Sequence, residues 1–415
     1  MLDGLRVVEL ATVIAAPCAC ALLCDHGAEV IKIENPGNPD ISRGWGKGDS
    51  DDMTGNLALK HAPGGGGSAF IHLNRGKKSL TLDPTRPEGN KILHALLATA
   101  DIFVTNVRQQ SLERMGVDYE SLRIKHPRLI YGHLSAWGRN GPKQNDPGYD
   151  FGAFWAYTGV MDILRSSEDA PMPRFPGGVG DFTTGSQLFG GILGALYHRE
   201  RTGEGQLVDA ALLRAGVWFL GQAIMQAAGG NSWALNARGP GVRETTELGK
   251  RATGITSSPF KCKDGRWIQL MGLEQKRHMP ATLRALGLAP EDVFGASTKA
   301  SKAIDWVRAT HIVDMRMASK TSDEWGAIFS KEGVWWQKVN RFNGMLGDEQ
   351  ANAAECFVAV PGTRHKVIGT PVIMSKANAT PKMPAPKFGE HTVSVMKNLG
   401  LTSEEIQRLK DNHII

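Results

Sequence analysis

The fold is decided by the first stretch of the chain, residues 5–34, which reads LRVVELATVIAAPCACALLCDHGAEVIKIE. Its two ends, residues 5–10 and 27–34, are short apolar runs rich in β-branched residues, as in buried strands. The small apolar residues between them, at 17–23, favour a helix that Gly27 closes. Strand, helix and strand in this order predict a parallel pair of strands.

The same alternation continues along the chain. Further apolar runs predict strands, and the amphipathic segments between them predict helices. The predicted strands are residues 78–82, 100–105, 129–134 and 206–212, and the predicted helices are residues 89–99, a stretch that begins at 111, and 182–201. This pattern is typical of a doubly wound α/β domain with a mostly parallel, Rossmann-like sheet, which binds ligands at the carboxyl ends of its strands.

The second half of the chain predicts a smaller α+β domain. Residues 258–270 predict a hairpin that turns at Asp264-Gly265, and helical patterns follow to about residue 330. The last part predicts, in order, a helix at 348–352, a strand at 370–373 and a helix at 402–409. We therefore predict a large domain in two parts, 1–225 and 336–415, around a small domain at 226–335.

Composition and charge exclude several classes of protein. The 415 residues are 41% hydrophobic and 22% charged, which is typical of a folded chain with a large core. The net charge is +6, but no block of five or more like charges indicates a nucleic-acid partner. Residues 215–237 form an uncharged run that contains glutamines, asparagines and glycines. We expect a buried helix and turn there, and no membrane span.

The cysteines predict a protein of the reducing cytoplasm. They are odd in number, and no basic segment followed by an apolar stretch opens the chain. None has zinc-finger spacing, so we expect buried free thiols and no metal site. The cysteines are Cys18, Cys20, Cys24, Cys262 and Cys356. The sequence also lacks the signatures of nucleotide hydrolases, zinc proteases and serine hydrolases.

A glycine-rich segment, Gly177-Gly178-Val179-Gly180-Asp181, precedes the long helix predicted at 182–201. Asp181 is expected at or next to the start of this helix, where an aspartate commonly serves as the N-cap. The same position also suits a carboxylate nucleophile, because the helix dipole keeps the carboxylate ionised and free N–H groups stabilise an oxyanion. Glycines before it would let an acyl group approach closely. The residues alone leave both interpretations open.

Seven motifs follow one another from Leu2 to about Ile414. They are Val7-Val8-Glu9-Leu10, the segment 27–34, Asn74-Arg75-Gly76-Lys77-Lys78-Ser79, Asn106 with Leu112-Glu113-Arg114-Met115-Gly116, Gly148-Tyr149-Asp150, Gly180-Asp181, and the segment 199–206. Each motif is weak alone, but in this order over the whole chain they are specific. Through them the sequence resembles the class III CoA-transferase family.

The resemblance implies an enzyme in which Asp181 is the nucleophile. Such an enzyme moves CoA from an acyl-CoA thioester to a free carboxylic acid by double displacement, through an aspartyl anhydride and an aspartyl-CoA thioester. Coenzyme A and acyl-CoA are then substrates, and no tightly bound cofactor is expected. The resemblance also implies the α/β fold described above and an interlocked homodimer.

Site residues follow from the resemblance by matching motifs. The implied CoA contacts are Thr12, Val13, Ala15, Arg43, Lys77, Asn106, Val107, Arg114 and Met115. The implied substrate-side residues are Ile14, Tyr149, Asp150, Gly178 and Gly180. Arg114 and Lys77 are expected to pair with the CoA phosphates. Ile14 is apolar where some family members have a polar residue, which argues against the smallest polar acids.

Two other functions stay open. The sequence also resembles α-methylacyl-CoA racemases, which pair the aspartate with a histidine in a Gly-His-Asp motif. This chain has Gly148-Tyr149-Asp150, and a tyrosine, with an ordinary pKa of about 10, is a poor base at neutral pH. The second alternative is an acyl-CoA-binding protein without catalysis, which would not need Asp181.

Overall fold

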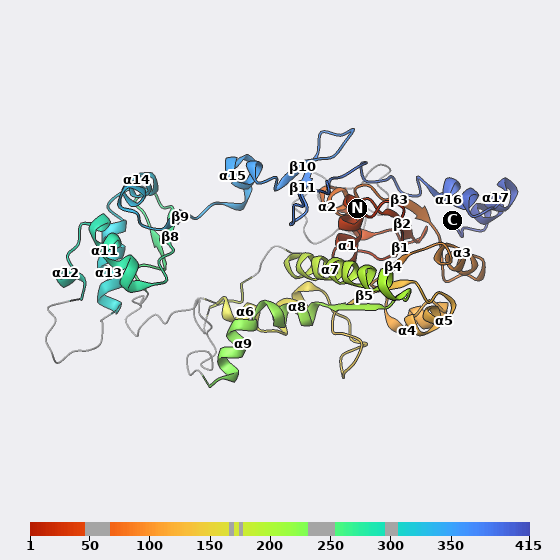
Figure 1. Ribbon diagram of the computed structural model, residues 1–415, viewed down its shortest axis with the longest axis horizontal. Helices are drawn as coiled ribbons and strands as arrows, with labels where there is room; N and C mark the ends of the chain where they lie inside the picture. The colour runs from red at the N-terminus through yellow and green to blue at the C-terminus, as the bar shows by residue number, and fades with distance from the viewer. Residues whose placement is uncertain (46–66, 166–169, 174–176, 231–253, 295–305) are drawn as a thin grey trace. The chain divides into compact units, whose positions relative to one another are not determined.

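The computed structural model describes residues 1–45, 67–165, 170–173, 177–230, 254–294 and 306–415 (Figure 1). The chain forms two compact units. The large unit comprises Met1–Val160, Arg174–Ile224 and Glu349–Ile415, and the small unit comprises Met161–Pro173 and Met225–Asp348. The return to the large unit starts at Glu349 and not at residue 336, because strand β9 (Trp336–Lys338) pairs within the small unit's sheet.

The large unit is built on a six-stranded parallel sheet with the order β3-β2-β1-β4-β5-β6. Its strands are β1 (Arg6–Leu10), β2 (Glu29–Glu34), β3 (Lys78–Thr81), β4 (Ile102–Thr105), β5 (Ile130–Ser135) and β6 (Leu207–Ala211). The strand order reverses between β1 and β4, where Leu10 lies opposite Thr105. The doubly wound parallel sheet predicted from the sequence is confirmed, and the reversal point is where such sheets bind ligands.

Helices α1 (Ala15–Asp25) and α7 (Val179–Thr202) cover one face of this sheet (Figure 1). They pack on the strand residues that point to that side, such as Val7. The two helices also touch each other closely, because a Cβ atom on Gly185 would lie 2.4 Å from the carbonyl oxygen of Ala15. Glycine inside α7 therefore lets the start of α1 approach α7 closely.

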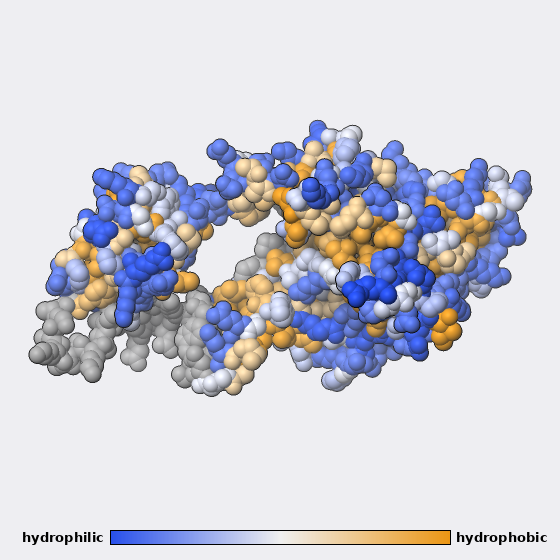
Figure 2. All heavy atoms as spheres, in the orientation of Figure 1, coloured by the Kyte–Doolittle hydropathy of each residue, from blue (hydrophilic) through white to orange (hydrophobic). Residues whose placement is uncertain are grey.

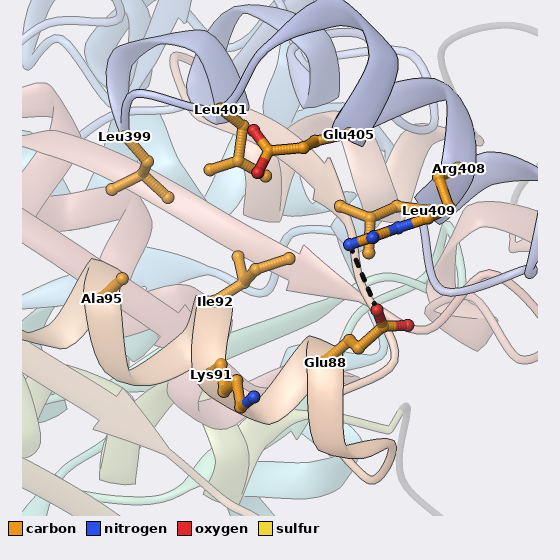
Figure 3. Close-up of a pocket in the computed structure, with 9 residues that line it drawn as sticks. All are labelled: Glu88, Lys91, Ile92, Ala95, Leu399, Leu401, Glu405, Arg408 and Leu409. Carbon is orange, nitrogen blue, oxygen red and sulfur yellow. Dashed lines mark ion pairs between the residues drawn. The ribbon is translucent and has the colours of Figure 1, made fainter.

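The opposite face is covered by helices from both ends of the chain. They are α3 (Pro87–Leu97), α4 (Gln109–Met115), α5 (Tyr119–Lys125), α16 (Thr392–Asn398) and α17 (Ser403–Asp411). Figure 3 shows a shallow pocket between α3 and α17, where Ile92 and Leu409 line an apolar floor. An ion pair of 3.4 Å between Arg408 and Glu88 lies at its edge. The C-terminal segment is thus part of the large unit's core.

The small unit has the α+β composition predicted from the sequence. Its antiparallel sheet contains β7 (Pro259–Lys261), β8 (Trp267–Leu270) and β9. Its helices include α11 (Gln275–Leu286), α12 (Pro290–Phe294), α13 (Trp306–Met317) and α14 (Ser322–Glu332). The predicted hairpin turn is confirmed, because Gly265 adopts a φ of +73° between β7 and β8.

Three predictions are corrected. Residues 370–373 are not a strand, and the strand pair of this region is β10 (Phe357–Ala359) with β11 (Lys366–Ile368). The run at 215–237 is mostly not buried: Ala215 and Gly216 at its start are buried, but none of the residues of α9 (Gly221–Ala228) is, and residues 231–237 lie outside the described part. Cys356 is exposed, whereas the other four cysteines are buried.

The described part of the chain includes further short elements. They are the 3-10 turn η1 (Ile41–Gly44), α2 (Ser68–Asn74), the π-helical turn η3 (Asp150–Ala156), α6 (Val160–Ile163), α8 (Leu212–Phe219), η4 (Phe342–Gly347) and α15 (Glu349–Ala353). No helix among the described residues has the length and apolar character needed to cross a bilayer.

Candidate active site

Asp181 lies in the first turn of α7. The helix begins at Val179, and its N-cap is Gly178, whose φ of +96° lies in the left-handed region that favours glycine. Asp181 is the third residue of the helix, so the interpretation of Asp181 as the N-cap is wrong. The first N–H groups of a helix have no acceptor within it. Those of Val179 and Gly180 are therefore available to an oxyanion beside Asp181.

The environment of Asp181 raises the pKa of its carboxyl group to about 7. Burial is the main cause, and the nearby carboxylate of Asp150 adds to it. The expectation that the helix start keeps Asp181 fully ionised is thus corrected, because burial and a like charge outweigh the helix dipole. Near neutral pH the group is divided between its charged and neutral forms.

The turn after β1 lies beside the end of β4, at the reversal point of the sheet. The Asn106 Oδ1 atom accepts a 3.2 Å hydrogen bond from the Thr12 N–H, and its Nδ2 donates to the Thr12 carbonyl at 2.8 Å. Ile14 continues this turn toward α7: its Cδ1 atom lies 3.2 Å from where a Cβ of Gly178 would be. The structure therefore brings together three of the predicted segments.

Val13 has an unusual backbone conformation in this turn. Its φ is +75°, which is strained for a β-branched residue and typical of functional sites. The Val13 N–H donates to Asp40 Oδ1 at 3.2 Å, and Asp40 Oδ2 lies 2.9 Å from Lys32 Nζ. Lys32 also donates to the Ala11 carbonyl at 2.7 Å. Buried charges below the turn hold it in this shape.

Lys77 and Arg43 belong to this buried support. The Lys77 Nζ atom lies 2.7 Å from Glu9 Oε2 and donates to the Pro17 carbonyl at 3.0 Å. Arg43 pairs with Glu34 through bonds of 2.6 and 2.8 Å. Both cations are buried and paired with carboxylates inside the protein, and their contact with CoA stays a prediction.

Exposed arginines do lie on α4, which follows β4. Arg114 is exposed and its Nη2 donates to Ser111 Oγ at 2.7 Å. Arg108, the N-cap of α4, is also exposed and lies two residues after Asn106. Sequence reasoning missed Arg108, although its place directly after the Asn106 motif was a usable signal. Both arginines suit the phosphates of a nucleotide.

The other predicted CoA and substrate residues differ in exposure. Val107 and Met115 are half-buried and pack against the core that contains Leu112. Ala15 is buried at the start of α1. Tyr149 is 71% exposed and precedes the π-helical turn η3, a type of turn found often at functional sites.

Gly180 is required by its contacts inside the protein. A Cβ atom at this position would lie 2.2 Å from Asp150 Oδ1 and 2.4 Å from Phe154 Cγ. At Gly177 a Cβ atom would lie 3.6 Å from the ring of Phe151, an ordinary contact distance. Glycine at position 180 therefore lets the Asp150 side chain pack against the first turn of α7. The sequence alone predicts a different reason for this glycine, namely the close approach of the substrate.

Similarity to known proteins extends over almost the whole chain. Residues 2–392 match the CoA-transferase family III. The chain belongs to this family. It is an enzyme of the class III CoA-transferases, as predicted from its sequence.

The class III CoA-transferase is similar to enzymes with different substrates. It is 32% identical to (R)-2-hydroxy-4-methylpentanoate CoA-transferase of Clostridioides difficile, over 100% of this chain and 99% of that one. It is 31% identical to succinate–glutarate CoA-transferase of Agrobacterium fabrum, over 96% and 95% of the two chains. A CAIB/BAIF family protein from Brucella suis shares the fold, with a TM-score of 0.75, 27% identity and coverage of 96% and 99%.

Two further side chains of this CoA-transferase lie beside the Asp181 turn. The His72 ring lies 5.4 Å from that of Phe182, and burial together with the adjacent Arg75 charge lowers the pKa of His72 to about 3. Burial raises the pKa of the Cys18 thiol to about 11. Both groups are therefore neutral at physiological pH. The Arg75 guanidinium is itself paired with Asp25 at 2.6 Å.

The described residues contain no group of three or more His, Cys, Asp or Glu side chains placed to hold a metal ion.

Proposed function

We propose that this enzyme transfers CoA from an acyl-CoA to a free carboxylic acid through covalent intermediates on Asp181. The raised pKa of a half-buried carboxyl group, at a helix start with free N–H groups, is the observation that supports this role most directly. A desolvated carboxylate is a better nucleophile than a hydrated one, and the N–H groups favour the tetrahedral oxyanion.

The proposed reaction has four displacements. The Asp181 carboxylate attacks the donor thioester, forming a mixed anhydride and releasing CoA thiolate. The thiolate attacks the aspartyl carbonyl, giving an aspartyl-CoA thioester and the free donor acid. The acceptor carboxylate attacks this thioester to give a second anhydride and the thiolate again. The thiolate finally attacks the acceptor carbonyl, which yields the new acyl-CoA and restores Asp181.

Two observations on the described residues argue against a racemase. The residue at the position of the racemase histidine is Tyr149, which is largely exposed. The histidine beside the turn is His72, and with a pKa of about 3 it has little affinity for a proton. Asp181 is also present where a pure binding protein would not require it.

We also propose that the acyl groups are apolar. Ile14 contacts Gly178, and Phe182 and Phe151 lie against the same turn. Among the described residues, the cations that act on nearby Cys18 are Arg75 and Lys77, and both are in buried ion pairs. A second carboxylate on the substrate could therefore not pair with Arg75 or Lys77 without breaking these ion pairs. We expect kcat/KM for 2-hydroxy-4-methylpentanoyl-CoA to exceed that for succinyl-CoA at least tenfold, or about 1.4 kcal/mol.

The proposed assembly is a homodimer in the cytoplasm. Several large apolar side chains of α8 and α9 are exposed, including Trp218 at 79%, together with Val217, Phe219, Ile224 and Met225. Figure 2 shows hydrophobic surface where these two helices lie in Figure 1. A second copy would cover such a surface. Sedimentation of a monomer at micromolar concentration would contradict this assembly.

The covalent intermediate is tested by trapping. Incubation with the donor acyl-CoA and hydroxylamine should convert Asp181 to a hydroxamate, because both the anhydride and the thioester have an activated aspartyl carbonyl. Peptide mass spectrometry locates the change. Asp181→Asn should fold and lose CoA exchange at least a thousandfold.

Asp118 offers a matched control for the trapping experiment. It also lies at a helix start, where its Oδ1 accepts from the Ser121 N–H at 3.1 Å and caps α5. It should not be labelled, and Asp118→Asn should keep exchange activity. Full exchange by a folded Asp181→Asn protein would show that another carboxylate is the nucleophile.

A further inference from the structure

Asp150 is a buried carboxylate tied to the turn that presents Asp181. It is 4% exposed and opens the π-helical turn η3. Its Oδ2 atom accepts hydrogen bonds from the Gly178 N–H at 2.8 Å and from Trp155 Nε1 at 3.2 Å. Since Gly178 is the N-cap of α7, this bond links η3 to the start of the nucleophile's helix.

The second oxygen of Asp150 has no such donor. Among the described residues, Oδ1 is buried without a hydrogen-bond partner. It lies against Gly180, where a Cβ atom would be only 2.2 Å away. A carboxylate with one unsatisfied oxygen keeps much of its negative potential. That potential acts directly beside Asp181.

Other charges near Asp181 do not cancel this potential. Cys18 on α1 is a neutral thiol, and His72 on α2 is a neutral imidazole. Among the described residues, the cations that act on Cys18 are Arg75 and Lys77, which are paired with Asp25 and Glu9. On β6, Asp209 is paired with His133 and Arg214. Among the described residues, Asp150 is the charged group that adds to burial in raising the pKa of Asp181.

Acylation changes the charge of Asp181. The carboxylate is negative before it attacks, whereas the anhydride and the aspartyl-CoA thioester are neutral at this residue, and the negative charge moves to the CoA sulfur. A fixed negative neighbour disfavours the charged form and favours the neutral ones.

We propose that Asp150 is a positioning residue that fixes the Gly178–Asp181 turn through the Gly178 N–H and, by its charge, promotes acylation of Asp181. This inference rests on the proposed function for its chemical meaning. It adds a second carboxylate to the machinery of CoA transfer, one that never bonds covalently to substrate.

The kinetic test uses Asp150→Asn, which keeps an oxygen acceptor for the Gly178 N–H and removes the charge. For the wild type, activity should rise with pH through about 7, because only the ionised form of Asp181 attacks. In Asp150→Asn this rise should move at least one pH unit lower. At pH 8, kcat should fall at least tenfold while KM for acyl-CoA changes less than threefold.

Asp118→Asn removes a charge at another helix start and should leave the pH profile unchanged. An Asp150→Asn profile that coincides with the wild type, or a change in KM alone, would overturn the inference. If Asp150→Asn does not fold, Asp150→Glu keeps the charge but displaces it. A lower kcat with the wild-type pH profile then supports the proposal, and full kcat overturns it.

A stability cycle tests the coupling without catalysis. Asp181→Asn should increase the folding equilibrium constant more at pH 8 than at pH 4.5, measured by urea unfolding. In the Asp150→Asn background this pH-dependent increase should be at least tenfold smaller, and an equal increase in both backgrounds would overturn the coupling. Hydroxylamine trapping tests the role of Asp181 separately. If Asp181 is labelled but its stability effect does not depend on Asp150, only this inference is refuted. If the two aspartates are coupled but Asp181 is not labelled, only the proposed function is refuted.

Discussion

The charge on Asp181 destabilises the folded protein at alkaline pH. Its pKa is raised by folding to about 7, so the folded state binds the proton more tightly than the unfolded state does. The stability that this proton contributes is complete below pH 4 and is lost as pH rises through about 7. We predict that Asp181→Asn raises the free energy of unfolding at pH 8 by on the order of 2–4 kcal/mol, and hardly at all at pH 4.

Urea unfolding at both pH values measures this difference. An equal effect of the substitution at pH 4 and pH 8 would show that the carboxyl group titrates normally. A buried carboxylate that lowers stability is a common feature of active sites, where activity and stability are in conflict.

A second prediction for a single residue concerns Arg114 and the binding of acyl-CoA. Since Arg114 is exposed on α4, the helix that follows β4 at the reversal point of the sheet, we expect it to contact a CoA phosphate. Arg114→Ala should raise KM for acyl-CoA about tenfold, or ~1.4 kcal/mol, and change kcat less than twofold, because the contact acts equally on ground and transition states.

Steady-state kinetics at saturating acceptor acid measure both constants. The control is Arg123→Ala, which removes an exposed arginine on α5 that pairs with Glu120. It should leave both constants unchanged. A large loss of kcat in Arg114→Ala would place this arginine at the reacting bond and refute its assignment to the nucleotide.

Some of the site could be predicted from the sequence, and some could not. The positions of Thr12, Asn106 and Asp181 could be predicted because strand ends and a helix start fix where short motifs lie. The partner of Lys77 could not, since a lysine near a strand has the same local sequence whether it pairs with a phosphate or with Glu9. The unsatisfied oxygen of Asp150 depends on packing between distant segments.

At the scale of elements, glycines in α7 divide into two kinds. A Cβ atom on Gly185 would meet the Ala15 backbone oxygen at 2.4 Å, whereas one on Gly190 would meet nothing within 4 Å. Gly185→Ala should therefore cost about 1–3 kcal/mol of stability by overpacking. Gly190→Ala should instead stabilise the helix by up to about 1 kcal/mol.

Thermal or urea unfolding compares the two variants, which differ by the same single methyl group. If both glycine substitutions stabilise α7, the close approach of α1 to α7 is not as described. Activity adds a second readout, because Gly185→Ala should also displace the turn at Ile14 that follows β1, while Gly190→Ala should leave exchange intact.

The elements that the sequence predicted well share a physical cause. Five of the six parallel strands, β1 to β5, are mostly buried, so they are largely apolar runs with helices between them, and the edge strand β6 is half-buried. Residues 370–373 have the same apolar character but no neighbour to pair with, and they form no strand. Helix α9 is apolar, so its sequence predicted a buried helix. The local sequence does not show whether the residues that cover an apolar helix belong to the same chain or to another one.

At the scale of the whole molecule, the last residues of the chain hold the large unit together. Leu409 of α17 is buried in the same core as Leu93 and Leu97 of α3. The Asp83 N–H also donates to the Ile414 carbonyl at 2.8 Å. We predict that Leu409→Ala lowers the free energy of unfolding by about 2–4 kcal/mol.

The matched control for Leu409→Ala is a substitution of the neighbouring Arg408. Its ion pair with Glu88 is exposed, so Arg408→Ala should change stability by less than about 1 kcal/mol. Urea unfolding of the full-length variants measures both. A Leu409→Ala protein as stable as the wild type would mean that α17 is only an accessory to the large unit.

The position of α17 in the sequence also determines when the core of the large unit can be completed during translation. The large unit's sheet is encoded by residue 211, but the helices that cover α3 are the last to be made. At about 5–20 residues per second, the ribosome needs on the order of 10–40 seconds to add the remaining chain. Until α16 and α17 are made, the newborn polypeptide exposes the apolar side of α3, so this enzyme is most open to aggregation and to chaperones during that interval.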